Sequence, residues 1–140
     1  MSAKFFLDTN VFVYTFDIRS VQKALRAREL VREALDSRTG LISFQVVQEF
    51  FSVAFRRFDF PMSIPDAEQY LSSVLRPLLA VHSSSALYAH ALQLLRLHRL
   101  SWYDSLILAA ATQAECEVLY TEDLQHGQRF GVVQIVNPFI

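Results

Sequence analysis

The sequence predicts an α/β fold, with a central parallel sheet of short strands flanked by helices. Brief apolar runs recur along the chain and end in polar, turn-forming residues, which is typical of strands buried on both faces. Longer segments with helical apolar spacing separate these runs. Successive strands are therefore expected to be joined by right-handed helical crossovers and to run parallel.

The first predicted strand, Phe5–Leu7, leads directly into Asp8, Thr9 and Asn10. Ligands of open α/β sheets bind outside the carboxyl ends of the strands, so Asp8 is expected at the functional edge. Later strands are expected at Leu41–Ile42, Leu78–Val81, Val118–Tyr120 and Val132–Val136.

Helices are expected between these strands. Ser20 is a favourable N-cap for a helix to Asp36, whose inward stripe would contain Val21, Leu25, Val31 and Leu35. A further helix is expected from Pro65 to Leu75, because proline is tolerated in a first turn and Pro77 would end the helix. The other helices are predicted at Val11–Phe16, at Ser43–Phe58, from Ser83–Ser85 to Arg99, and at Trp102–Glu115.

The composition fits one compact domain over residues 1–140, with 52% apolar and 19% charged residues. Charges interrupt the apolar runs, so no segment suits a membrane span, and the N-terminus lacks the form of a signal peptide. The single cysteine, Cys116, excludes an internal disulfide framework. The expected location is cytoplasmic.

The formal net charge of −1 does not suit a protein that binds nucleic acid by overall charge. Binding of nucleic acid would instead need local basic patches or bound cations. Basic residues do gather on three predicted helices, although a solvated helix face explains each group more simply. The groups are Lys23, Arg26, Arg28 and Arg32; Arg56 and Arg57; and Arg96 and Arg99.

Four acidic residues are candidates for chemistry. Asp8 and Asp123 each follow a predicted strand, while Asp104 begins a helix. Glu49 lies among apolar helix residues. If all four face one cleft, their repulsion would raise the pKa of some of them, and a divalent cation would remove this conflict. Oxygen ligands suit Mg²⁺ or Mn²⁺, whereas Cys116 and the four histidines show no zinc-ligand spacing.

Each acid also has an ordinary structural explanation. Asp8 suits an Asx turn, and Asp104 completes a capping box with Ser101. Asp123 could be a solvated turn residue, and Glu49 could be partly exposed or paired with an arginine. The hypothesis of a shared metal site therefore depends on the convergence of the four acids.

Three further polar residues, Thr9, Asn10 and Thr121, could orient a carboxylate or a metal-bound water, although they are also common in turns. The chain has no Gly-rich phosphate loop, which argues against a nucleotide-dependent kinase or dehydrogenase. A haloacid-dehalogenase-like phosphatase would need an aspartate where Asn10 stands.

Four short motifs contain these acids: Phe6-Leu7-Asp8-Thr9-Asn10, Gln48-Glu49-Phe50, Tyr103-Asp104-Ser105-x-Ile107-x-Ala109-Ala110 and Leu119-Tyr120-Thr121-Glu122-Asp123-Leu124. Their order and approximate spacing resemble those of PIN domains. The resemblance extends from Phe5 to about Phe139 and is closest to the VapC-like toxin ribonucleases of prokaryotic toxin–antitoxin pairs.

This resemblance implies a metal-dependent endoribonuclease that is the toxin of a type II toxin–antitoxin pair. It implies that Asp8, Glu49, Asp104 and Asp123 hold Mg²⁺, with Mn²⁺ as a possible substitute. It also implies an RNA substrate, a homodimer and a cognate antitoxin. Glu122 competes with Asp123 for the metal, although Asp123 matches the family position. The alternative is a catalytically silent PIN-fold interaction module, whose interface the 13% aromatic content would suit.

Overall fold

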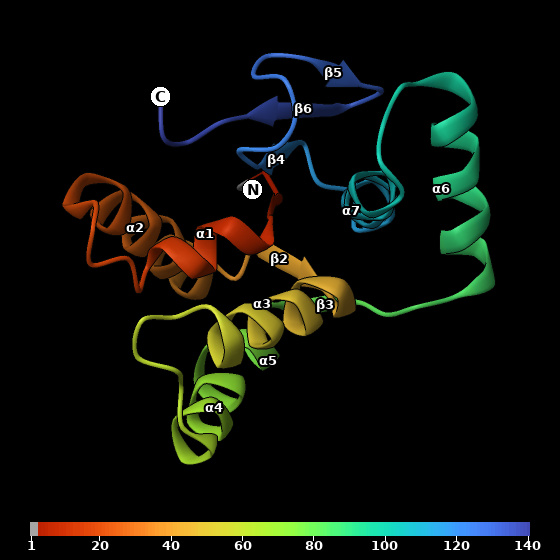
Figure 1. Cartoon of the computed structure of the whole chain (residues 1–140). Coiled ribbons are helices and arrows are strands. Elements are labelled where there is room, and N and C mark those ends of the chain that lie inside the picture. The colour runs from red at the N-terminus through yellow and green to blue at the C-terminus, as the bar shows by residue number, and fades with distance from the viewer. Residues whose placement is uncertain (1–2) are drawn as a thin grey trace.

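The computed structural model describes residues 3–140, which form a twisted sheet with helices on both faces (Figure 1). The strands follow the order β3-β2-β1-β4-β6-β5, with parallel neighbours except for the antiparallel pair β5 and β6. Their bounds are β1 (Phe5–Leu7), β2 (Gly40–Ser43), β3 (Leu79–Val81), β4 (Val118–Tyr120), β5 (Arg129–Phe130) and β6 (Val133–Val136).

The helices α1 and α2 lie on one side of the sheet, and α6 and α7 pack together on the other (Figure 1). The helical bounds are α1 (Thr9–Tyr14), α2 (Val21–Ser37), α3 (Phe44–Arg56), α4 (Ile64–Tyr70), a π-helical turn (Leu71–Leu75), α5 (Arg76–Leu78), α6 (Ser85–Leu97) and α7 (Trp102–Gln113). In the described range, no helix has the length and apolar character needed to cross a bilayer.

The predicted α/β class with a central, mostly parallel sheet is confirmed. The antiparallel strand β5 is an addition to the prediction, because two residues are too short for a recognisable apolar pattern. It forms through the tight link to β6, where Gly131 has a φ of 62°. Glycine adopts this left-handed conformation without a Cβ clash, which permits the hairpin.

The core of the molecule surrounds β1. Its central position between β2 and β4 leaves Phe6 and Leu7 fully buried. On one face, α7 is buried from Ser105 to Ala111, and its small alanine side chains allow close packing. This packing brings the N-terminal turn of α7 to the carboxyl-end edge of the sheet.

The predicted inward stripe of α2 is wrong at two positions. Val21 and Leu25 are 69% and 58% exposed. The buried face instead contains three alanines and two larger residues: Ala24, Ala27, Leu30, Val31 and Ala34. Alanines bring the helix axis close to the sheet, so the buried face follows the small residues rather than the largest apolar ones.

Pro77 does not end the helical run, contrary to the prediction. The run continues to Leu78 because the turn before Pro77 widens, with the Arg76 N–H bonded to the Leu71 carbonyl. Pro77 therefore lies in the first turn of α5, where its missing N–H costs little.

Other helix ends differ from the prediction by one or two residues. Helix α1 begins at Thr9 rather than Val11, because Asp8 is its N-cap. The helices α3, α6 and α7 end at Arg56, Leu97 and Gln113.

A Gly40→Ala substitution should destabilise the fold, because a Cβ on Gly40 would overlap the Ala34 Cβ and lie 2.9 Å from Phe5 Cε2. Overpacking of this kind reduces the free energy of unfolding by about 1–3 kcal/mol. Urea denaturation measures the change. The exposed control Arg32→Ala should stay within about 0.5 kcal/mol of the parent. Equal stability of Gly40→Ala and the parent would contradict this packing.

Candidate active site

A cavity of about 310 Å³ lies at the carboxyl ends of β1 and β4, and all four acids singled out from the sequence line it. Asp8 and Asp123 follow these two neighbouring strands, and Asp104 comes from the first turn of α7. Glu49 projects from α3. The structure therefore brings together four side chains that are far apart in the sequence.

Asp8 is the buried member of this group, with 4% exposure. Its Oδ1 accepts the Thr9 N–H at 2.7 Å, and its Oδ2 accepts the Thr121 hydroxyl at 2.7 Å. Burial raises the pKa of Asp8 to about 7, the two hydrogen bonds oppose this rise, and the nearby charges of Asp123 and Glu49 add to it. The Asp8 carboxylate is therefore held in one orientation and is costly to ionise in the free protein.

Thr121 links Asp8 to Asp123. The fully buried Thr121 hydroxyl donates to Asp8 and accepts the Asp123 N–H at 3.1 Å. Partial burial raises the pKa of Asp123, and the negative charges of Asp104 and Glu122 raise it further. One buried hydroxyl thus sets the relative position of two acids that follow different strands.

Glu49 is held by a second set of contacts. Its Oε1 accepts the Thr9 hydroxyl at 3.0 Å and the Gln45 side-chain amide at 3.3 Å. Gln45 is 3% exposed and also donates to the Tyr103 carbonyl at 3.2 Å. Gln45 is absent from the residues predicted for the site, although its position four residues before Glu49 puts both on one helix face.

Glu122 does not line the cavity. Its carboxylate accepts the Tyr14 hydroxyl and pairs with Lys23 Nζ at 2.9 Å. Partial burial raises the pKa of Glu122, but the bonds from Tyr14 and Lys23 lower it overall. Of the two adjacent acids, Asp123 is the one that lines the cavity.

Asp104 and Asn10 present groups that the protein leaves free. The Asp104 N–H bonds to Ser101 Oγ at 3.1 Å, so the serine half of the predicted capping box forms while the Asp104 side chain lines the cavity. Both atoms of the Asn10 side-chain amide are buried without a protein partner in the described structure. A buried amide in this state needs water or a ligand to satisfy it.

The family model for the PIN domain matches residues 5–129, a range that contains all four acids. This chain belongs to the PIN-domain family. A comparison with curated protein sequences gives no significant match.

Solved structures similar to this PIN domain include a toxin–antitoxin complex from Klebsiella pneumoniae, with 22% identity, a TM-score of 0.66 and coverage of 99% of this chain and 98% of that chain. The VapC20 sarcin-ricin loop cleaving toxin of Mycobacterium tuberculosis has 19% identity, a TM-score of 0.62 and coverage of 86% and 90%. DNA-bound VapBC from Salmonella typhimurium has 24% identity, a TM-score of 0.61 and coverage of 96% and 97%. These similarities concern the fold.

The donor set of this PIN domain fits a hard divalent ion. The cavity offers carboxylate oxygens and the unsatisfied Asn10 amide, which suit magnesium or manganese. Within residues 3–140, no three His, Cys, Asp or Glu side chains form a group close enough to hold a metal ion directly. Magnesium commonly keeps several of its waters and is then held by carboxylates through them.

Besides Glu49, the helix α3 and its C-cap contribute three further residues to the cavity lining. Gln45, Glu49, Val53 and Arg57 follow one another at intervals of four residues, and all four line it. Arg57 is the only basic residue among the described residues of this lining. From the sequence, Arg57 is expected on a solvated face. Its position four residues after Val53 and eight after Glu49 is the signal that would have placed it here.

An Asp8→Asn substitution should stabilise the metal-free protein most above pH 7. The pKa of Asp8 is about 7 in the folded state and 3.8 in the unfolded reference. Between these values the unfolded chain releases the proton first, so the contribution of Asp8 to stability decreases as the pH rises. Asparagine cannot ionise, so Asp8→Asn should raise the free energy of unfolding at pH 8 by about 2–4 kcal/mol relative to the parent.

Urea denaturation in EDTA at pH 4.5 and pH 8 measures this effect. The exposed control Asp66→Asn should follow the parent at both pH values. A pH dependence of Asp8→Asn identical to that of the parent would contradict the raised pKa.

Proposed function

We propose that the chain, as one PIN domain over residues 1–140, is a metal-dependent endoribonuclease. The observation that carries this proposal is the meeting of Asp8, Glu49, Asp104 and Asp123 at one cavity, where Asp8 is buried with its pKa raised to about 7. Such a cluster is costly unless a cation compensates its charge. Mg²⁺ is the proposed ion, and Mn²⁺ is a possible substitute.

Asp8 and Asp104 are proposed as the principal ligands, partly through water. Glu49 and Asp123 would complete the site, and one of them would orient the attacking water. Thr9 and Thr121 support these roles because they hold Glu49 and Asp8 in fixed orientations. Asn10 supplies an amide that can hold a water or a phosphate oxygen.

Hydrolysis of an RNA phosphodiester requires an activated water. It also requires stabilisation of the negative charge that develops on the oxygens around the phosphorus. A bound divalent ion supplies both, because it lowers the pKa of its water and neutralises the developing charge. The protein side chains orient the water and the phosphate. The oxygen-rich cavity suits this reaction better than nucleotide-dependent chemistry, for which the sequence has no phosphate loop.

The biological role proposed is that of the toxin in a type II toxin–antitoxin pair. Support comes from the fold shared with VapC20 and with the toxin–antitoxin complexes from Klebsiella pneumoniae and Salmonella typhimurium. The cognate antitoxin would be the inhibitory partner, and a homodimer the active form. A catalytically silent interaction module is the competing function, and metal binding separates the two.

Asp8→Asn and Asp104→Asn should each lower kcat for RNA cleavage by roughly 100-fold or more, because each removes an anionic group from the reacting centre. The measurement is cleavage of fluorescent RNA at saturating Mg²⁺. Asp66→Asn is a matched control, since Asp66 also follows a serine N-cap by three residues but lies outside the cavity. Parent-like cleavage by Asp8→Asn would exclude the proposed site.

Calorimetric titration with MgCl₂ or MnCl₂ should detect binding to the parent protein. Binding should weaken at least 10-fold in Asp8→Asn and Asp104→Asn, because each loses an anionic oxygen ligand. It should persist in Asp66→Asn. Absence of metal binding by the folded parent would favour the interaction module.

A further inference from the structure

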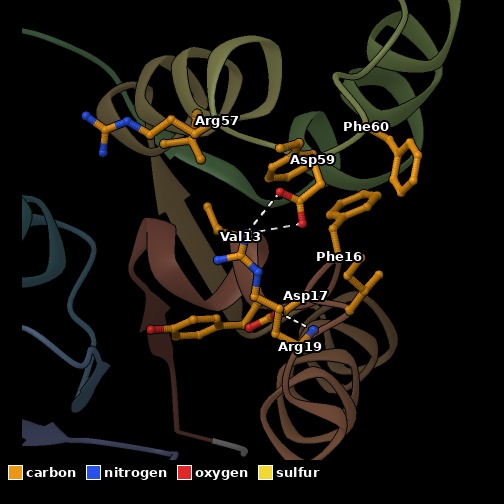
Figure 2. A pocket seen from close by; sticks show the side chains of 11 residues that line it. Val13, Phe16, Asp17, Arg19, Arg57, Asp59 and Phe60 are labelled. Atoms are coloured by element: carbon orange, nitrogen blue, oxygen red, sulfur yellow. Dashed lines mark hydrogen bonds and ion pairs between the residues drawn. The ribbon is translucent and has the colours of Figure 1, made fainter.

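A second cavity, of about 380 Å³, adjoins the acid-lined one (Figure 2). The two share the lining residues Val13, Tyr14, Val53 and Arg57. Its walls come from α1, the link between α1 and α2, the end of α3 and the segment that follows α3. Its volume lies within the range of small-ligand sites, about 300–1,000 Å³. It therefore offers space for part of a ligand whose reacting bond lies at the acids.

The second cavity has aromatic side chains with free surface. Phe60 is 80% exposed and forms no aromatic pair among the described residues. Phe16 is 38% exposed and packs against Phe58 with the ring centroids 5.2 Å apart. In Figure 2, Phe16 and Phe60 lie at the same end of the cavity. A planar ring from a ligand could therefore stack on the exposed surfaces of Phe60 and Phe16.

Polar groups accompany the aromatic rings. Arg19 binds both carboxylate oxygens of Asp59, at 3.0 Å and 3.3 Å, and Figure 2 shows this pair between Arg57 and Phe60. Both side chains are substantially exposed, so they retain hydrogen-bonding capacity toward a ligand. Their donors and acceptors match those on the edges of nucleobases.

Arg57 is free to bind an anion. Arg19 satisfies Asp59, and the Arg57 side chain makes no ion pair or hydrogen bond with residues 3–140. Arg57 borders both cavities, and in Figure 2 its side chain extends away from Asp59 and Phe60. A long, exposed arginine side chain at this boundary can reach a phosphate of a chain that passes from one cavity to the other. A guanidinium binds phosphate with paired, charge-assisted hydrogen bonds.

We propose that the second cavity is a nucleobase subsite for the RNA. The base of a nucleotide flanking the cleaved bond stacks on Phe60 and Phe16, and Arg57 binds the phosphate between that nucleotide and the acids. This inference rests on the proposed ribonuclease function. Arg57 favours an anionic ligand at the junction of the two cavities, because it is the one cation of this lining without a partner in residues 3–140. The other three charged residues of the lining bind one another: Arg19 pairs with Asp59, and its backbone N–H bonds to Asp17.

Photo-crosslinking with RNA of random sequence identifies the occupant of the second cavity. The probe is a randomised RNA hexanucleotide pool containing 5-iodouridine, bound to Asp8→Asn protein in Mg²⁺ to prevent cleavage. The expected crosslink, mapped by mass spectrometry, falls on Phe60 or Phe16. Crosslinks confined to residues outside this cavity would overturn the proposal.

Two variants with matched controls measure how much Phe60 and Arg57 contribute to RNA binding. Phe60→Ala should raise KM by roughly 10-fold or more, with a smaller effect on kcat, because base stacking is lost, and Phe60→Trp should restore KM. Phe55→Ala is the control, since Phe55 is an exposed phenylalanine near the end of α3, five residues before Phe60, and lines neither cavity. Parent-like KM in Phe60→Ala would overturn the stacking role.

Arg57→Gln should reduce the slope of log affinity against log salt by about 0.7, the value for one single-strand phosphate contact. Fluorescence anisotropy with the labelled hexanucleotide pool measures this slope. The adjacent exposed residue Arg56 provides the control Arg56→Gln, which should leave the slope unchanged. An unchanged slope in Arg57→Gln would overturn the phosphate contact.

The outcomes separate this inference from the proposed function. Loss of cleavage in Asp8→Asn together with parent-like KM in Phe60→Ala would retain the ribonuclease and reject the nucleobase subsite. Cleavage unaffected by Asp8→Asn would reject the ribonuclease site itself. If Phe60→Ala changed only the oligomeric state or antitoxin binding, the cavity would be a protein-docking site and the proposal would be wrong.

Discussion

The burial of the Asp8 carboxylate beside other acids is the constraint on which the site depends. Desolvation and the charges of Asp123 and Glu49 oppose its ionisation, while Thr9 and Thr121 hold it by two hydrogen bonds. The protein thus holds a carboxyl group where solvent cannot stabilise its anionic form. That arrangement suits a cation, and it explains why the neighbouring side chains are fixed by hydroxyl and amide groups rather than by lysine or arginine.

The parallel sheet makes this arrangement possible. Because β1 and β4 are neighbours, the residues that follow them meet at one edge, and Thr121 can reach Asp8 across 113 positions of sequence. The buried helix α7 adds Asp104 at its first turn. The same geometry leaves Glu122 out of the cavity lining, and Lys23 and Tyr14 bind it.

The helix α3 connects the acid-lined cavity with the aromatic one. Its face with four-residue spacing begins at Gln45 and leads to the C-cap Arg57, so one helix and its cap carry an acid at one cavity and a cation at the boundary of both. A shift of α3 would move Glu49 and Arg57 together. The metal binding and the RNA contact proposed above would then respond to the same packing contacts.

The sequence alone determined the α/β class, the edge of the sheet that matters and the four acids that line the cavity, because strand ends and helix starts leave local signals at Asp8, Asp104 and Asp123. Only the tertiary structure decided which neighbours they have. The orientation of Glu122, the bridging by Gln45 and the position of Arg57 depend on contacts between distant segments. Local pattern likewise misplaced the buried face of α2, since the approach of a helix to a sheet is set by packing against residues that periodicity does not reveal.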